Sequence, residues 1–439
     1  MKTARVNSRV GSFSADITSL SAFTVCHFVV DFVCAFILFR LYESEAIVSG
    51  SVLPYFILYN VLAFGLECII GPFFSLKSAR ACSCIGCALL IMATFVGMFV
   101  QHSLGGIEIM RRGDSSSLMA ESHSIQFLVI LAITLAGIGN AFFHVGGGID
   151  AISRNIGRYW RGGVFISSGA LGIPLGAIYA GMTTSWFFYV IPVVVVALSA
   201  LSIWAFCRVN SLPSDAQALG IATDGAAATA SVDNYVRSRY ASLFGARVRI
   251  GLLICALVVV LLRSSFSFLS LPFYFTRTTA SFSPLLIAVA FFLGKFFGGF
   301  MADLFGARLI GALSLVISAF CLCFGQGELP LYLAVFCINV TTSITVVSTV
   351  AWTRGRAGLG FGLTTLAFLL GSAVVIGDFH ENWFQSLKNA DLLTSFGMPV
   401  VMLTLLVMAT LLVLSTPKTH SKKRPEQSDA TPEPNRVEA

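Results

Sequence analysis

Three residues that can carry protons lie inside long apolar runs of this sequence. His27 and Asp31 are four positions apart in the first run, and Glu67 lies in the second. Residues four apart share one face of a helix, and a histidine beside a carboxylate can titrate in the physiological pH range. We therefore expect His27, Asp31 and Glu67 to take up and release protons. The alternative is a neutral His27 that is hydrogen-bonded to Asp31 and only holds the structure together.

Two basic side chains occupy the same kind of position in the second half of the chain. Arg263 and Lys295 lie within apolar runs, where a charge is costly and marks a functional site by default. A guanidinium binds a carboxylate or phosphonate through two parallel hydrogen bonds, whereas an ammonium acts as a point charge. We expect Arg263 and Lys295 to bind an anionic group of a substrate while an acid in the first half carries the proton.

Two alternatives stay open for these charges. In one, Asp31 pairs with Arg263 across an empty cavity, and substrate or protons part the two groups. Glu67 and Lys295 would pair and part in the same way. In the other, both pairs are static salt bridges that only stabilise the fold.

Further polar side chains in the apolar runs are expected to line a cavity for the substrate. They are Tyr59, Asn140, His144 and Asn339. Each of them could instead join two helices through a hydrogen bond, which is a common role of such residues in membranes.

One motif occurs twice along the chain. Phe64–Gly71 reads FGLECIIG, and Phe292–Gly299 reads FLGKFFGG. When Gly71 is aligned with Gly299, Glu67 falls on Lys295, and Arg80 falls on Arg308. The repeat indicates two similar halves, and the exchange of acid for base indicates that the halves meet around something polar.

The elements that must position these residues are membrane-spanning helices. The chain has 439 residues, of which 56% are hydrophobic and 11% are charged, against about 25% charged in soluble domains. Apolar runs of roughly 20 residues, enough to cross a bilayer, predict an all-α membrane protein. We expect twelve transmembrane helices that form two six-helix bundles related by pseudo-twofold symmetry. The expected spans are Ile17–Arg40, Ser51–Phe74, Arg80–Gln101, Ile125–Gly146, Gly163–Thr183, Trp186–Cys207, Arg249–Leu271, Phe282–Ala302, Ala307–Phe324, Leu331–Ala351, Gly358–Phe379 and Leu392–Leu414.

A polar stretch divides these spans into two sets of six. We expect an N-terminal bundle over 1–207, a cytoplasmic linker over 208–248, a C-terminal bundle over 249–415 and a disordered cytoplasmic tail over 416–439. Most of the 28 Lys and Arg residues fall in segments that lie inside when both termini are cytoplasmic, in agreement with the positive-inside rule. This asymmetry accounts for the net charge of +7, so the charge gives no reason to expect nucleic acid as a partner.

Gly299–Arg308, GFMADLFGAR, resembles the cytoplasmic loop signature of the major facilitator superfamily, and the resemblance extends over essentially the whole chain. In that family the loop helps to close the inward gate. The resemblance implies that Asp303 does so here, toward Arg354 or toward the helix that starts near Gly162. The alternative is that Asp303 only caps a helix. The basic residues of the gate would be Arg80, Arg308 and Arg354.

Two positions depart from this family pattern. Leu304 stands where a basic residue normally follows the Asp, and the loop after the second span has Ser75 in place of the Asp. The gate is therefore expected to depend on Asp303 alone.

A second resemblance concerns Phe142–Gly148, FFHVGGG, and the pair of His27 and Asp31. Both look like the fosmidomycin-resistance type of efflux carrier, although the Pro-Glu that often follows the His is absent. This resemblance implies efflux of an anionic or amphipathic compound.

Taken together, these residues predict a proton-coupled secondary transporter of the cell membrane. It would act as a monomer among membrane lipids, with a small solute and protons as partners and without a cofactor or metal. An uptake carrier for an organic anion or sugar-like solute, and a carrier-fold sensor without transport, are the alternatives. An enzyme is disfavoured because the sequence has no cluster with metal-ligand spacing, no activated nucleophile and no phosphate-binding loop.

Overall fold

The computed structural model describes residues 2–48, 53–110, 118–154, 157–182, 186–206, 245–277, 283–373 and 392–417. Within these ranges the regular structure is helical throughout, so the predicted all-α class is confirmed. Most of the predicted linker and the predicted tail lie outside the described residues.

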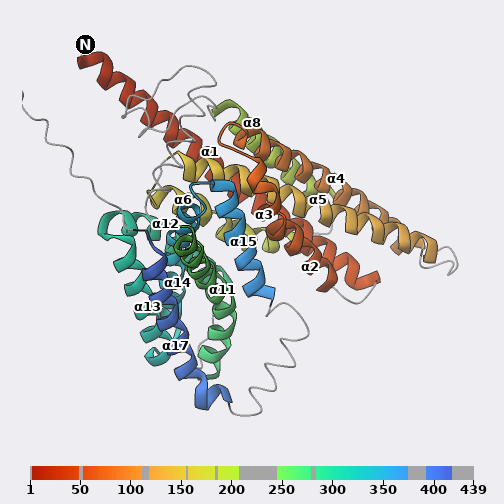
Figure 1. Cartoon of the computed structure of the whole chain (residues 1–439). Coiled ribbons are helices and arrows are strands. Elements are labelled where there is room, and N and C mark those ends of the chain that lie inside the picture. The colour runs from red at the N-terminus through yellow and green to blue at the C-terminus, as the bar shows by residue number, and fades with distance from the viewer. Residues whose placement is uncertain are drawn as a thin grey trace, which may run out of the picture.

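The first half of the chain, up to residue 206, forms the helices that are labelled α1 to α8 in Figure 1. They are α1 (Lys2–Val48), α2 (Leu53–Asn60), α3 (Glu67–Ile70), α4 (Ala79–Met110), α5 (Leu118–Ser153), α6 (Trp160–Ser167), α7 (Gly169–Gly181) and α8 (Val190–Phe206). A π-helical turn, Val61–Gly65, joins α2 to α3, and 3₁₀ turns occupy Gly71–Phe73 and Trp186–Tyr189. We call residues 2–206 the N-terminal half.

In the described part of the second half, from residue 245 onward, there are six further long helices. They are α11 (Ala246–Arg277), α12 (Pro284–Phe305), α13 (Ala307–Phe324), α14 (Glu328–Trp352), α15 (Ala357–Ala373) and α17 (Leu392–Ser415). We call residues 245–417 the C-terminal half.

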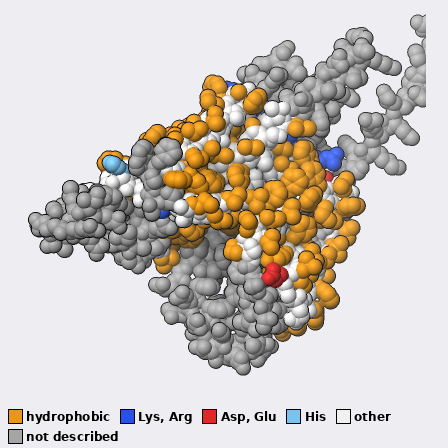
Figure 2. Space-filling view, turned by 180° about the vertical axis from the view of Figure 1, so that it is seen from behind, with side chains coloured by type: hydrophobic (Ala, Val, Ile, Leu, Met, Phe, Trp, Pro, Cys, Tyr) orange, Lys and Arg blue, Asp and Glu red, His pale blue; other side chains and the backbone are white. Residues whose placement is uncertain are grey.

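Ten segments in the described part of the chain are long and apolar enough to cross a membrane. Two shorter apolar helices, Val190–Phe206 and Ala357–Ser372, coincide with the sixth and eleventh expected spans. Each of the twelve predicted spans therefore has a helical counterpart. The outer surface suits a lipid environment, because hydrophobic side chains cover most of the face in Figure 2 that is not grey.

Two predicted spans are interrupted in the structure, although the sequence suggested continuous helices. The second span changes from α-helix to a π-helical turn at Val61 and resumes as α3 at Glu67. The fifth span breaks at Ser168, between α6 and α7. Both interruptions lie beside polar residues of the candidate site, and irregular backbone at membrane depth is tolerated where protein surrounds it.

Each half has its own hydrophobic core. One cluster of buried side chains gathers α1, α2 and α4 to α8, and it also includes Val346, Val350, Ala357 and Phe361 from the C-terminal half. The other cluster gathers α11 to α14 and α17 and includes Tyr159 from the N-terminal half. The two cores therefore exchange a few side chains where the halves touch.

The halves touch along two seams. In the α6–α12 seam, Trp160 and Gly163 pack against Gly299 and Phe300. In the α3–α15 seam, Glu67 and Gly71 of the N-terminal half pack against α15. Figure 1 shows α6 beside α12 and α3 beside α15. Both seams lie at the span ends that the sequence predicts to be cytoplasmic.

Glycine makes the α3–α15 seam possible. A Cβ atom on Gly358 would collide with the backbone of Gly71, and one on Gly71 would collide with the backbone of Gly358. A Cβ on Gly362 would likewise strike the backbone of Glu67 and Cys68. The helices approach until their backbones touch, which is how small residues act between membrane helices.

Candidate functional site

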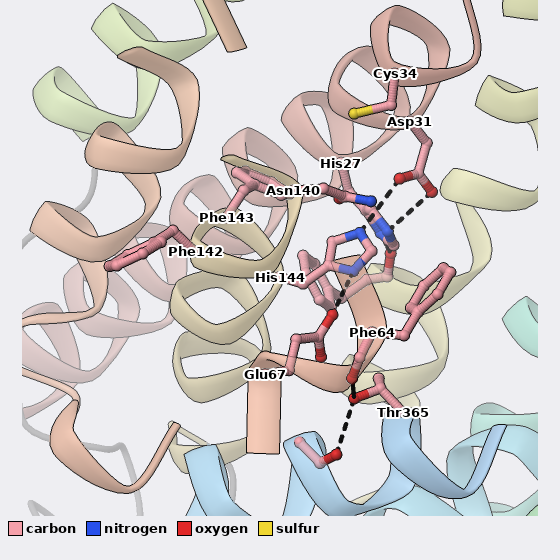
Figure 3. A network of polar contacts seen from close by, with 12 residues as sticks. His27, Asp31, Cys34, Phe64, Glu67, Asn140, Phe142, Phe143, His144 and Thr365 are labelled. Carbon is pink, nitrogen blue, oxygen red and sulfur yellow. Dashed lines mark hydrogen bonds and ion pairs between the residues drawn. The ribbon is translucent and has the colours of Figure 1, made fainter. Parts of the chain in front are cut away.

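Four titratable side chains from three spans converge inside the N-terminal half, as Figure 3 shows. They are His27 and Asp31 from α1, Glu67 from α3 and His144 from α5, and we call them the acid–histidine cluster. His27 Nε2 lies 3.3 Å from Asp31 Oδ2, and His144 Nε2 lies 3.2 Å from Asp31 Oδ1. His144 Nδ1 lies 3.0 Å from Glu67 Oε1. His144 therefore bridges two acids that are 36 positions apart.

The cluster is almost completely removed from solvent. The exposed fraction is 0% for Glu67, 4% for His27, and 6% for both Asp31 and His144. Separating a buried ion pair leaves an uncompensated charge in a poorly solvating interior, which is strongly unfavourable. The protonation states of the four groups are therefore tied to one another.

Local backbone irregularity positions His27. The fifth span breaks at Ser168, and the carbonyl of Phe165 accepts hydrogen bonds from Ser168 Oγ at 3.0 Å and from His27 Nδ1 at 2.7 Å. The Phe165 ring also stacks on the imidazole of His27, with ring centroids 4.6 Å apart. Gly169 leaves room for Asp31, because a Cβ there would collide with the carboxylate.

The donors and acceptors determine how many protons the cluster holds. A carbonyl oxygen only accepts, so Nδ1 of His27 carries a hydrogen, and its Nε2 carries another only when the ring is charged. Each of the three histidine–carboxylate contacts needs one hydrogen. All three are satisfied when both histidines are charged and both carboxylates are ionised, or when a carboxyl group supplies a hydrogen in place of a histidine. Losing one proton leaves at least one contact without its hydrogen.

Tyr59 and Asn140 lie close to the cluster and bind each other. Asn140 Nδ2 donates to the Tyr59 hydroxyl at 2.8 Å, and both residues are buried. Asn140 Oδ1 has no hydrogen-bond partner among the described residues. Figure 3 places Asn140 next to Asp31 and His144.

Lys295 of α12 is the cation of the other half that lies within Coulombic range of Asp31, and it is also within Coulombic range of Arg263. Arg263 itself donates to the Thr345 hydroxyl at 3.4 Å within the C-terminal half. Asp31 contacts His27 and His144 of its own half. Glu67 binds His144 rather than Lys295, because α5 supplies a closer partner on its own side.

Asn339 belongs to the interior of the C-terminal half. Its amide nitrogen donates to the Val335 carbonyl at 2.8 Å, one turn earlier in α14. Its Cβ packs where Gly294 leaves space on α12. Asn339 thus holds helices of one half together in this structure and contacts none of the cluster residues.

Among the expected gating residues, Asp303 reaches across the halves. Its carboxylate accepts hydrogen bonds from the backbone N–H groups of Tyr159, at 3.0 and 3.1 Å, and of Trp160, at 2.9 Å. These N–H groups lie at the N-terminal end of α6. The partner of Asp303 is therefore the helix start near Gly162 and not Arg354. A carboxylate at a helix N-terminus is favoured by the helix dipole and by charge-assisted hydrogen bonds.

The three arginines that the sequence predicts for the gate lie apart from this contact. Arg80 donates to the Trp204 carbonyl at 3.3 Å and stacks over the Trp204 ring at 4.2 Å. Arg308 donates to the Thr416 carbonyl at 2.7 and 3.1 Å. Arg354 is exposed in the turn between α14 and α15, with a φ of 61°. In this conformation Arg80 and Arg308 bind within their own halves.

Sequence reasoning missed Thr365 on α15. Its hydroxyl donates to Gly362 O at 3.0 Å in its own helix and to Phe64 O at 3.3 Å in the other half. The sequence feature that could have indicated Thr365 is its position one turn after the glycine-rich start of the eleventh span. His144, predicted from the sequence as a substrate ligand, contacts both Asp31 and Glu67 in the structure.

His27, Asp31 and His144 are also the residues that could hold a metal ion. Their ligand atoms all lie within 4.8 Å of one another, which no other such group does in the described part of the chain. The contacts are at hydrogen-bond length, a spacing that shared protons fill.

No protein-family model and no curated protein matches this sequence. Solved structures do. The E. coli fucose:proton symporter FucP has 15% identity and a TM-score of 0.54, over 92% of this chain and 100% of that chain. The proton:xylose symporter XylE bound to 6-bromo-6-deoxy-D-glucose has 17% identity and a TM-score of 0.52, over 92% and 95% of the two chains. The structure therefore has the fold of major facilitator transporters, as expected from the loop signature, and is that of a multi-pass membrane protein.

Proposed function

We propose that this chain is a secondary active transporter that moves a small solute across the cell membrane by alternating access. Protons drive it, and it exports an anionic or amphipathic compound as an antiporter. Its two bundles, 1–207 and 249–415, rock about the enclosed site with both termini in the cytoplasm. It works as a monomer in the lipid bilayer.

The observation that carries this proposal is the acid–histidine cluster. Four titratable groups share three hydrogen-bonded contacts in a solvent-free interior. Such an arrangement is costly to keep in a membrane unless protons move through it. A transporter also needs a substrate site that both halves can enclose. The fold suits this, because transporters built from two repeated halves place their sites between the halves near mid-membrane.

The substrate is proposed to bind between the cluster and the cations of the C-terminal half. Lys295 and Arg263 would attract its anionic group, and the unpartnered Oδ1 of Asn140 would accept a hydrogen bond from it. Tyr59 would orient Asn140 through their hydrogen bond. Asp303 would hold the halves together at the predicted cytoplasmic end.

Proteoliposomes with an imposed pH gradient and a pH-sensitive dye inside test this proposal. The probes are a panel of phosphonates, organic acids, sugars and amphipathic drugs. We expect at least one probe to dissipate the gradient in the wild type and none to do so in Asp31→Asn. His102→Gln, which alters an exposed histidine outside the cluster, should behave as the wild type. A solute flux that depends on sodium and is unaffected by the pH gradient would contradict proton coupling.

A second candidate function has its own support. FucP and XylE, whose fold this chain shares, are symporters of fucose and of xylose with protons. Uptake of a sugar-like solute is therefore the alternative, and the same assay separates the two. A symported solute moves in the direction of the proton flux, whereas an exported one moves against it.

A further inference from the structure

A buried carboxylate oxygen lies in the α3–α15 seam without a partner. His144 binds Oε1 of Glu67, but Glu67 Oε2 has no hydrogen-bond partner among the described residues, although Glu67 is completely buried. An ionised oxygen in such a place is costly, because neither water nor a donor stabilises it. The seam around Glu67 is therefore sensitive to whether this group carries a proton.

Thr365 is the polar side chain of the opposite half that lies close enough to interact with this carboxylate. Its hydroxyl hydrogen is engaged by the carbonyls of Phe64 and Gly362. The lone pairs of a hydroxyl remain available to accept a hydrogen bond. Thr365 is thus arranged to accept from a protonated Glu67 while it donates across the seam to Phe64.

We propose that Thr365 links the proton on Glu67 to the closure of the α3–α15 seam. With Glu67 protonated, its O–H donates to Thr365 Oγ1, Thr365 donates to Phe64 O, and the closed seam has all its hydrogen bonds. With Glu67 ionised, the closed seam buries the Oε2 oxygen of a carboxylate without a hydrogen-bond donor, and opening the seam admits the water that solvates it. This inference rests on the proposed proton coupling and names the contact that transmits it.

The other titratable groups around Glu67 stay on its own side of the seam. His144 of α5 binds it, Asp31 of α1 acts on it through space, and the thiols of Cys68 and Cys82 lie within Coulombic range. His144 is the group through which a proton would pass between Asp31 and Glu67. Of these groups, Glu67 and its neighbour Cys68 have backbone that packs against α15, at Gly362, and of the two it is Glu67 whose side chain binds His144. The seam contact and the cluster therefore meet at Glu67. Its protonation can therefore act directly on the contact between the halves.

The sign of the pH response follows from this chemistry. The closed seam is favoured at low pH, where Glu67 is neutral, and is lost as pH rises and the group ionises. Spin labels at Lys77 and Arg356, which are exposed on either side of this seam, report its width in the full-length protein. Attachment through genetically encoded keto amino acids leaves the native cysteines untouched.

In the wild type, we expect the population with a short distance between the labels to fall about tenfold from the acid to the alkaline end of the pH range in which the protein stays folded, since an unsatisfied buried group shifts an equilibrium by that order. Thr365→Val should abolish most of this change, because the seam loses both its acceptor for Glu67 and its donor to Phe64. Thr365→Ser should restore it. In Glu67→Gln, the distance between the two labels should stay short at both ends of the pH range.

Thr364→Val is the matched control, because Thr364 binds Thr349 and Gly360 within the C-terminal half. It should respond to pH as the wild type does. A wild-type response in Thr365→Val would overturn the proposed link and leave proton coupling intact. The absence of any pH response in the wild type, combined with no probe-driven proton flux in proteoliposomes, would instead remove the proposed function itself. Elution as a monodisperse species shows that each variant is folded.

Discussion

The two seams between the halves are built on different chemistry. In the α6–α12 seam, the Asp303 carboxylate receives backbone N–H groups at the start of α6, and Trp160 stacks on Phe300. In the α3–α15 seam, glycines bring two backbones together, and Glu67 lies among them. The difference follows from the sequence, because Ser75 replaces the acid that the loop signature expects in the first half.

This comparison indicates how one contact can stay while the other responds to protons. Asp303 is satisfied by fixed peptide N–H groups that do not titrate. Glu67 depends on His144 and Thr365 and has one oxygen without a partner. We therefore expect the α3–α15 seam to open first as pH rises, while the α6–α12 seam keeps the halves aligned.

The largest effect should come from filling the glycine contact. Gly358→Val adds atoms where the backbone of Gly71 lies, so the α3–α15 seam cannot close at any pH. We expect the short Lys77–Arg356 distance to disappear, a change of about a hundredfold or more because backbone overlap costs several kcal/mol. Gly251→Val is the control, since its Cβ meets no atom within 4 Å. A closed seam in Gly358→Val would show that the glycine contact is dispensable.

Weakening the charged contact should affect the opposite seam. Asp303→Asn keeps an oxygen acceptor but loses the charge that strengthens the hydrogen bonds to Tyr159 and Trp160. Bonds to charged groups contribute about 1.5–3 kcal/mol, so we expect the α6–α12 seam to open about tenfold more often. Spin labels at Arg158 and Leu304 measure this, and Leu304→Asn without labels is a surface control for folding. An unchanged distance would mean that Asp303 only caps α6.

Breaking the bridge between the acids should act on proton response alone. His144→Gln keeps one hydrogen bond but removes the imidazole whose charged form pairs with both Asp31 and Glu67, so Glu67 ionises less readily. We expect the pH dependence of the Lys77–Arg356 distance to shrink about tenfold, with the α6–α12 seam unchanged. His102→Gln serves as the control. A full pH response in His144→Gln would separate Glu67 from the rest of the cluster.

The smallest effect should come from a residue that touches neither seam. Arg80→Ala removes the contact with Trp204, whose cation–π part contributes about 0.5–1 kcal/mol at an exposed site. We expect a slightly lower unfolding temperature in a thermal melt and unchanged distances across both seams. A changed distance across either seam would indicate that Arg80 contributes to the gate, as the sequence motif predicts.

Much of the scaffold could be predicted from the sequence for simple reasons. Hydrocarbon thickness sets the length of apolar runs, so each predicted span has a helical counterpart. The spacing of His27 and Asp31 put them on one face of α1, and the structure keeps them 3.3 Å apart. Such features depend on local periodicity, which a single sequence contains.

The contacts between spans could not be predicted in the same way. His144 joins Asp31 to Glu67 because α5 passes beside both α1 and α3, and no local pattern encodes that crossing. The sequence left two partners open for Asp303, Arg354 and the helix start near Gly162, and the structure shows the helix start, through the N–H groups of Tyr159 and Trp160. Every residue but proline has an N–H group, so residue type could not decide between the two.

The π-helical turn at Val61–Gly65 has a consequence for the register of the second span. It accommodates one more residue than a regular turn, and one residue corresponds to about 100° of rotation around a helix axis. Deleting Leu62 would keep every ionisable group of the protein and yet swing Glu67 away from His144. In this span a single inserted amino acid, without any chemistry of its own, decides whether the acid faces its histidine or the lipid.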